Sequence, residues 1–147
     1  MKLFTGSFTH VIDAKNRVSV PRKILEVLRR LDSAEQIVVT AGFDGCLFLY
    51  PEAEFERMGE AVDNGSIGEQ DVRDFSRTFY SSAEGCPLDK NGRMLLPDAL
   101  KRAVGLKDKV VFAGVGRRVE LWRPDTWEER QARALVDYES QAKEVFR

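Results

Sequence analysis

The 147-residue sequence has little cysteine and histidine, with only Cys46, Cys86 and His10. A structural zinc site usually takes four nitrogen or sulfur ligands that come in closely spaced pairs. These three residues are far apart in the sequence, so we predict no metal site. The sequence also lacks a glycine-rich phosphate loop, an HExxH motif and a GxSxG motif. Together these absences predict a protein that is not an enzyme and binds no cofactor.

Long hydrophobic runs are also missing. No apolar stretch approaches the ~20 residues that a membrane-spanning helix needs, and residues 1–6 lack the apolar region of a signal peptide. The sequence therefore predicts a soluble, cytoplasmic protein with no membrane partner. A hydrophobic content of 43% excludes a wholly disordered chain. The length suits one compact domain or two small intertwined ones.

The main positive feature is an internal repeat. Residues 13–21 read DAKNRVSVP and residues 89–97 read DKNGRMLLP, so that Asp, Arg and Pro recur at an offset of 76. Each copy continues with a short amphipathic helix and two apolar β runs around a turn. The first copy places these at 22–31, 36–41 and 46–50, and the second at 98–104, 109–113 and 117–123, with a hairpin turn at 114–116. Agreement over the whole unit indicates a duplicated module.

Helical segments follow each copy. Residues 52–80 predict two amphipathic linker helices, and residues 125–147 predict one long C-terminal helix. Their apolar faces carry aromatic side chains that either pack on the core or form a subunit interface. These aromatic residues are Phe75, Phe79, Trp127 and Tyr138. Two small β modules offer limited surface to cover all of them, which favours a role in self-association for some.

The two Asp-x-x-x-Arg segments, Asp13 to Arg17 and Asp89 to Arg93, predict tight hairpin turns. Asn16 in the first, and Asn91-Gly92 in the second, can adopt the positive φ that such turns need. The Asp carboxylate can accept hydrogen bonds from the turn backbone and pair with the Arg. One interpretation is a purely structural salt bridge. The other is a guanidinium held ready for DNA phosphates or guanine edges, and basic residues in both copies favour it.

On these motifs, on the Val-Pro and Leu-Pro steps that follow them and on the opening strand at residues 4–12, the chain resembles the MraZ family. The modules of that family are similar to AbrB- and SpoVT-like swapped-hairpin DNA-binding domains. The resemblance implies a β-rich α+β fold in which two tandem modules form a pseudo-twofold β-barrel, with linker helices and a C-terminal helix. The corresponding segments are 5–51 for the first module, 52–80 for the linker, 81–124 for the second module and 125–147 for the C-terminal helix.

The resemblance also implies a function. It implies a nucleoid-associated transcriptional regulator that binds short direct repeats in double-stranded DNA, at the promoter of the bacterial division and cell-wall gene cluster, as a ring-shaped homo-oligomer. It places DNA contact on the two turns, at Arg17 and Arg93 first, then at Lys15, Asn16, Lys90 and Asn91, with Asp13 and Asp89 supporting the turns. The alternative is a protein-interaction module of antitoxin type, but such modules usually occur as one copy with a disordered tail.

The charge distribution agrees with DNA binding, although the net charge of −1 over the whole chain argues against it. Residues 1–51 carry +2 and residues 83–124 carry +4, whereas residues 52–82 carry −5 and residues 125–147 carry −2. Both β modules are therefore basic, and both helical segments are acidic. The modest positive charge predicts weak binding by one subunit, which oligomerisation would strengthen.

Overall fold

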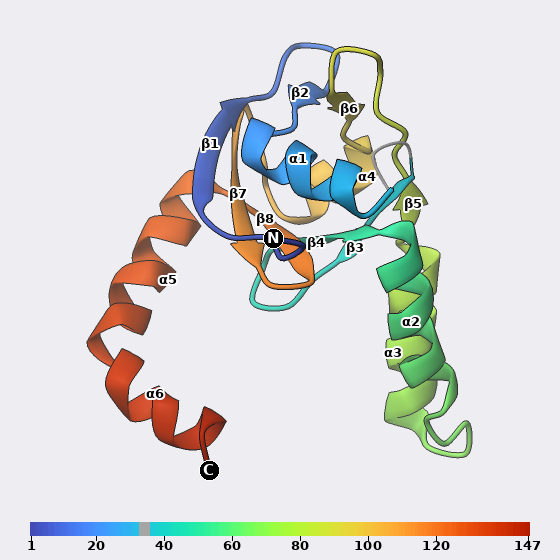
Figure 1. Cartoon of the computed structure of the whole chain (residues 1–147). Helices are drawn as coiled ribbons and strands as arrows, with labels where there is room; N and C mark the ends of the chain where they lie inside the picture. Colours follow the sequence, from blue (N-terminus) through green and yellow to red (C-terminus); the bar gives the residue numbers. More distant parts are fainter. Residues whose placement is uncertain (33–35) are drawn as a thin grey trace.

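The computed structural model describes residues 1–32 and 36–147. Figure 1 shows a central β structure with helices packed around it. The strands are β1 (Ser7–Val11), β2 (Arg17–Ser19), β3 (Ile37–Ala41), β4 (Leu47–Pro51), β5 (Glu84–Gly85), β6 (Arg93–Leu95), β7 (Lys109–Val115) and β8 (Arg118–Trp122). The helices are α1 (Arg22–Arg30), α2 (Glu52–Asp63), α3 (Gln70–Ser81), α4 (Asp98–Ala103), α5 (Pro124–Val136) and α6 (Tyr138–Val145).

The strands of the two modules share one antiparallel sheet. Its order is β1-β7-β8-β4-β3-β5, so each module's first strand pairs with a strand of the other module. Exchanging the equivalent strands (β1 with β5, β3 with β7, β4 with β8) gives the same order read from the opposite edge of the sheet. The interleaved, pseudo-twofold arrangement of the two modules is therefore visible in the topology.

The second sheet is a short ladder of β2 and β6. Val18 lies opposite Met94, its own equivalent at the repeat offset of 76, so the pseudo-twofold axis passes through this pair. The barrel expected from the resemblance is not closed within residues 1–32 and 36–147. The strands there form two separate sheets, because β2 and β6 pair only with each other apart from one isolated bridge between Ile12 and Val18.

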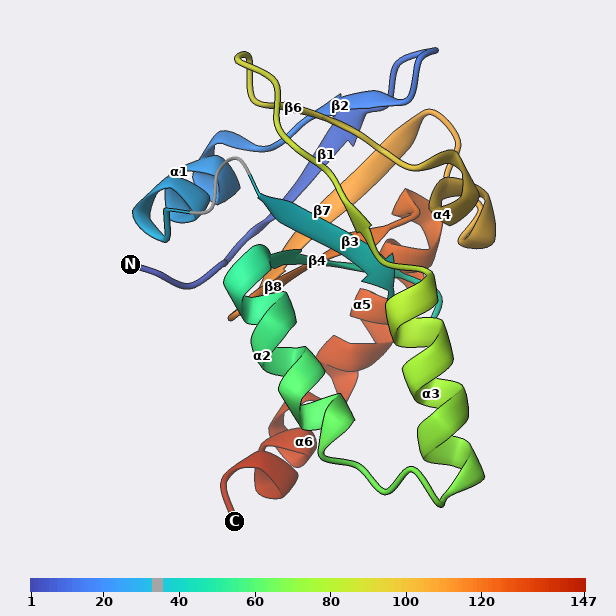
Figure 2. The same cartoon turned by 90° about the vertical axis from the view of Figure 1, so that its right-hand side faces the viewer.

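The core lies on both faces of the large sheet. One face packs against α1, α4 and the β2–β6 ladder, with Ile24, Leu28, Met94 and Phe112 among the fully buried side chains. On the opposite face, a smaller aromatic cluster that includes Trp122 packs against α2 and α5. Figure 2 shows α2 and α3 side by side beneath the sheet. Both faces of the sheet are thus covered, which explains the nearly continuous apolar runs of β4 and β7.

The short helices begin and end where the sequence predicts, within a residue. Pro21 and Pro97 immediately precede α1 and α4, and their carbonyl oxygens accept the first helical hydrogen bonds. Gly105 ends α4 with φ +70°. Its N–H donates to Arg102 and the N–H of Leu106 donates to Lys101, which is the hydrogen-bond pattern of a Schellman motif. Gly105 therefore terminates α4.

The hairpin turn predicted at 114–116 lies slightly later in the chain, between the end of β7 at Val115 and the start of β8 at Arg118. Gly114 and Val115 continue β7, since they pair with Val119 and Arg118 of β8 on one side and the N-terminal segment lies alongside on the other. The N–H of Gly114 donates to the Gly6 carbonyl at 2.8 Å, and Phe4 and Gly116 exchange two hydrogen bonds. The turn itself lies at Gly116, with φ +73°. Pairing on both sides, with β8 and with the N-terminal segment, thus continues the strand past the glycine at which the local pattern predicted its end.

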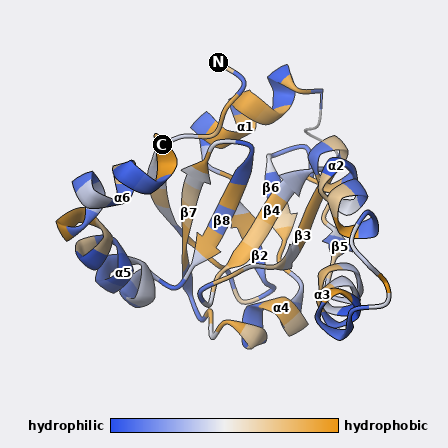
Figure 3. Cartoon of the chain, turned by 90° about the horizontal axis from the view of Figure 1, so that it is seen from below, coloured by the Kyte–Doolittle hydropathy of each residue, from blue (hydrophilic) through white to orange (hydrophobic). Residues whose placement is uncertain are grey.

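The single C-terminal helix predicted for 125–147 is also wrong. The helix is divided into α5 and α6 at Asp137, where φ is −102° and ψ is 7°. Neither helix contains a buried residue, so no core packing holds the two segments in line. Figure 3 shows that they are mainly hydrophilic, with a hydrophobic stretch where they meet. Leu135 and Val136, which are exposed, lie at this junction.

Candidate nucleic-acid interface

The first Asp-x-x-x-Arg segment, residues 13–17, forms a closed hairpin turn that we name turn 1. Oδ1 of Asp13 accepts hydrogen bonds from the backbone N–H groups of Lys15 (2.9 Å) and Arg17 (2.8 Å). Its Oδ2 accepts a third from Nε of Arg17 at 2.8 Å. Asn16 has φ +62°, the left-handed conformation that closes a three-residue hairpin loop. The carboxylate therefore fixes both the backbone of the turn and the side chain of Arg17.

The second segment, residues 89–93, repeats this geometry and is named turn 2. Asp89 accepts hydrogen bonds from the N–H groups of Asn91 (2.8 Å) and Arg93 (2.9 Å), and from Nε of Arg93 (2.9 Å). Gly92 takes the left-handed position with φ +76°. The expected positive φ thus falls on Asn16 and Gly92, and Asn91 does not share it. The same hydrogen bonds at an offset of 76 show that the two copies of the repeat share the same hydrogen-bonded turn geometry.

The electrostatics of both turns favour charged aspartates. The backbone hydrogen bond from Arg17 is the largest cause that lowers the pKa of Asp13, and the side chain of Arg17 adds to it. The backbone hydrogen bond from Arg93 likewise lowers the pKa of Asp89. Each Arg uses Nε for this pair, so the bonds given above leave its two terminal nitrogens available for a ligand. A guanidinium held by one edge is suited to bidentate recognition with the other.

Both arginines lie on the outer face of the β2–β6 ladder. Arg17 is opposite Leu95 and Arg93 is opposite Ser19, while the intervening Val18 and Met94 point into the core. Because side chains alternate along a strand, the four outer residues share one surface. Arg17 and Arg93 are two ladder positions apart, or roughly 7 Å along the strands. Figures 1 and 2 show both turns projecting from the same end of the molecule.

The other predicted contact residues lie at or near the tips of the turns. Lys15, Lys90 and Asn91 are exposed. Asn16 is half-buried, and its side-chain amide is within hydrogen-bonding distance of groups on α4. The structure thus brings all the predicted residues to one end of the protein, but the side chain of Asn16 is partly engaged in hydrogen bonds to α4.

Two residues of this surface were missed by the sequence reasoning. Leu95 is 60% exposed and Ser19 is exposed, and both flank the arginines on the outer face. The alternation of Arg17-Val18-Ser19 and of Arg93-Met94-Leu95 is the signal that could have identified them. Leu95 offers an exposed apolar side chain next to both arginines on this face.

The cysteines and the histidine do not form a site. Burial raises the pKa of the Cys46 and Cys86 thiols to about 12, and both are free. Nδ1 of His10 lies 2.7 Å from the carbonyl oxygen of Ser19, which ties β1 to β2. Within residues 1–32 and 36–147, no three His, Cys, Asp or Glu side chains are grouped as metal ligands would be. Over the same residues, no helix is both long and apolar enough to cross a bilayer.

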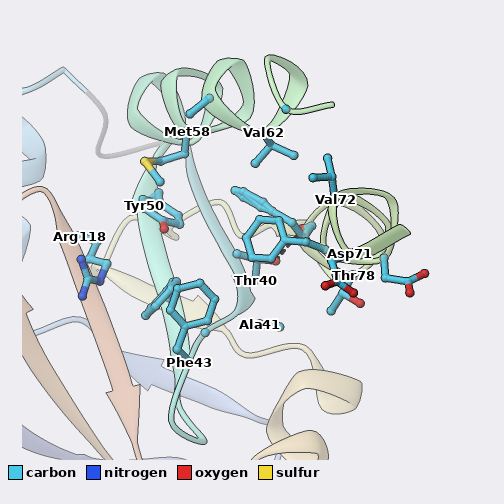
Figure 4. A pocket seen from close by; sticks show the side chains of 17 residues that line it. Thr40, Ala41, Phe43, Tyr50, Met58, Val62, Asp71, Val72, Thr78 and Arg118 are labelled. Atoms are coloured by element: carbon cyan, nitrogen blue, oxygen red, sulfur yellow. Dashed lines mark hydrogen bonds between the residues drawn. The ribbon is translucent and has the colours of Figure 1, made fainter. Parts of the chain in front are cut away.

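A separate apolar groove of about 840 Å³ lies between β3–β4 and α2–α3, away from the turns. Figure 4 shows Phe43, Tyr50 and Met58 lining it. Arg118 and Phe48 also line the groove, and the Arg118 guanidinium carbon lies over the Phe48 ring, 4.8 Å from the ring centroid. The lining of the groove is mainly apolar, so we regard it as a packing surface.

Comparison with known proteins agrees with the duplicated architecture. The family model described as "MraZ protein, putative antitoxin-like" matches the chain twice, over residues 3–78 and 79–146. The chain belongs to the MraZ family. The two matches together cover nearly its whole length and divide it near the C-terminal end of α3, consistent with two tandem modules.

Curated members of the family are similar along most of the chain. A protein named transcriptional regulator MraZ from Heliobacterium modesticaldum is 37% identical over 144 residues, which is 98% of this chain and 97% of the relative. Proteins of the same name from Lachnoclostridium phytofermentans and Natranaerobius thermophilus are 40% and 38% identical, over 86% and 97% of this chain and 85% and 96% of theirs. The MraZ family consists of non-enzymatic regulators, so the prediction that this chain is not an enzyme is confirmed.

Proposed function

We propose that this MraZ family member is a transcriptional regulator that binds double-stranded DNA through turn 1 and turn 2. The observation that carries the proposal is the paired geometry of Arg17 and Arg93. Each guanidinium is anchored through Nε to an Asp, and both lie on one outer face of a rigid ladder. Lys15, Lys90 and Asn91 at the tips contact the backbone of the DNA, and Asp13 and Asp89 orient the arginines.

The DNA target that we propose is a set of short direct repeats in the promoter of the bacterial division and cell-wall gene cluster, where the protein acts in the cytoplasm on the nucleoid. The family resemblance supports this target. The charge distribution supports the mode of binding, because the two modules carry +2 and +4 while the helical segments are acidic. The acidic helices lie away from the turns (Figure 2), so they do not oppose the approach of DNA.

We also propose that the chain assembles with copies of itself into a ring. The internal repeat supports this. After the first module, α3 packs against α2 and β3, whereas α6, which follows α5 after the second module, has no buried residue. Leu135 at the end of α5 and Tyr138 at the start of α6 are 64% and 71% exposed. A second copy that covers this face would bury them, and several subunits would then hold their turns against successive DNA repeats at high effective concentration.

The decisive experiment measures binding to the upstream DNA of the chain's own gene for the wild type, Arg17→Ala and Arg93→Ala. Each substitution should weaken binding roughly 10-fold, as expected for one lost guanidinium contact of about 1.4 kcal/mol. Arg77→Ala is the matched control. Arg77 also forms an Asp–Arg pair (with Asp74 at 2.9 Å), but on the acidic helix α3, and its loss should leave binding unchanged.

Salt dependence distinguishes contact with DNA from a general loss of structure. The slope of log affinity against log salt should fall by about 0.9 for each phosphate contact removed. Folded Arg17→Ala and Arg93→Ala proteins with wild-type affinity and slope would refute DNA contact by the turns. Affinity for a protein partner with no affinity for DNA would favour the antitoxin-type alternative.

Solution mass tests the assembly. The chain has a mass of 16.7 kDa, and light scattering at micromolar concentration should give a multiple of it. Leu135→Ser should reduce the multiple, whereas Val11→Ser, also at an exposed apolar residue but on β1, should not. A strict monomer of the wild type would refute the ring.

A further inference from the structure

The two turns are supported by helices of the opposite module, at equivalent positions of the repeat. Position 16 of turn 1 contacts residue 101 of α4. Position 92 of turn 2 lies against residue 25 of α1. The two pairs are related by the offset of 76, so each turn is contacted at the same position by the equivalent helix residue of the other module. The chemistry of the support differs between the two.

The support of turn 1 is polar. Nζ of Lys101 donates a hydrogen bond to Oδ1 of Asn16 at 2.8 Å, and Lys101 is half-buried. Nδ2 of Asn16 is 3.4 Å from Oδ1 of Asp98, and Asp98 in turn pairs with Arg102 at 3.0 Å. The carbonyl oxygen of Asn16 also accepts the N–H of Leu96 at 2.8 Å. Both the backbone and the side chain of Asn16 are therefore tied to the second module.

The support of turn 2 is apolar. Gly92 is buried, and a Cβ placed on it would lie 2.9 Å from Cδ2 of Leu25. Leu25 therefore packs against the backbone of turn 2, at the position equivalent to the one at which Lys101 contacts the side chain of Asn16 in turn 1. The remaining backbone contact is the same in both, since the carbonyl of Gly92 accepts the N–H of Val20 at 3.0 Å. A glycine–leucine contact replaces the asparagine–lysine hydrogen bond.

We infer that Lys101 is a positioning residue for DNA binding by turn 1, which holds Asn16 and thereby the adjacent Arg17 in place. This inference rests on the proposed function of the turns. The ammonium of Lys101 is directed to Asn16 and acts through it. Asn16 accordingly serves to anchor turn 1 to α4. The two turns thus present their arginines through different supports, one polar and one apolar, and turn 1 depends on a contact that turn 2 lacks.

The test uses the chain's own repeat as a template. Lys101→Leu should weaken DNA binding roughly five-fold, as expected for one lost hydrogen bond. Adding Asn16→Gly should restore most of the affinity, because the pair then has the glycine–leucine chemistry of turn 2. Asn16→Gly keeps the left-handed conformation without strain. Lys107→Leu, at an exposed lysine outside the turns, is the matched control and should have no effect.

A double-mutant cycle separates positioning from direct contact. In an Arg17→Ala background, Lys101→Leu should cause no further loss of affinity or salt slope, whereas in an Arg93→Ala background its effect should remain. A further drop of about 0.9 in the salt slope in the Arg17→Ala background would mean that Lys101 contacts phosphate itself, and would overturn the inference. Failure of the double variant to recover affinity would overturn it as well. If Arg17→Ala alone had no effect, the proposed function of turn 1 would fail first, and the two failures are thus distinguishable.

Discussion

Replacing Gly114 by alanine would place a methyl group inside the backbone of the N-terminal segment. A Cβ at this position would lie 2.4 Å from the nitrogen of Thr5 and 2.6 Å from the carbonyl carbon of Phe4. These are backbone atoms, so the segment must move away from β7. The movement breaks three hydrogen bonds: the Gly114 N–H to Gly6, and the two between Phe4 and Gly116. It also uncovers Phe4, which is 1% exposed in the native fold.

The magnitude follows from these contacts. Three backbone hydrogen bonds at about 1 kcal/mol each, with partial loss of Phe4 burial at about 2 kcal/mol, give a destabilisation of roughly 5 kcal/mol. Because the segment leads through β1 into turn 1, the variant should also bind DNA more weakly. Urea unfolding followed by tryptophan fluorescence measures the free energy of unfolding.

Gly85→Ala is the matched control, since a Cβ there meets no atom within 4 Å and should change stability by less than about 0.5 kcal/mol. If Gly114→Ala were destabilised no more than Gly85→Ala, the reasoning from close backbone approach would be refuted.

Three further predictions concern the turns, the thiols and the ladder. The hydrogen bonds that lower the pKa values of Asp13 and Asp89 stabilise the fold fully above the unfolded pKa of about 3.8, and this contribution is lost as the pH falls through the folded pKa values. The urea midpoint of Asp89→Asn should therefore change less between pH 5 and pH 2.5 than that of the wild type. An unchanged pH profile would contradict this. Cys46 and Cys86, with pKa values raised by burial to about 12, should resist a thiol reagent at pH 8 until the protein is unfolded, and rapid labelling of the native protein would count against their burial. Met94→Ala, at a fully buried position, should lower the free energy of unfolding by about 2–5 kcal/mol, and a loss below 1 kcal/mol would show that the ladder does not depend on this side chain.

The local elements were largely predictable because their signals are local. Alternation and turn residues located β3, β4 and β8 within a residue or two. Asp and Arg four residues apart, around a residue able to adopt positive φ, predicted the hydrogen bonds of both turns. These patterns depend on neighbours within a few positions, so the sequence states them directly.

The errors arose where pairing and packing, more than local residue type, decide the outcome. Gly114 continues β7 between Val119 of β8 and residues 4–6 from the other end of the chain. The C-terminal helix is divided at Asp137, where no packing against the core keeps it continuous. The expected barrel became two sheets because β2 and β6 form a ladder of their own. None of these outcomes has a local signature.

The sequence by itself determined the duplication, the two aspartate-anchored turns and the partition of charge between basic modules and acidic helices. Each is a matter of residue type and short spacing. Only the tertiary structure decided that the modules interleave their strands, that Arg17 and Arg93 share one outer face, and that Lys101 holds turn 1 where Leu25 packs on turn 2. Those results depend on contacts between residues 45 to 106 positions apart, because they require a strand or helix of one module to meet a turn or strand of the other.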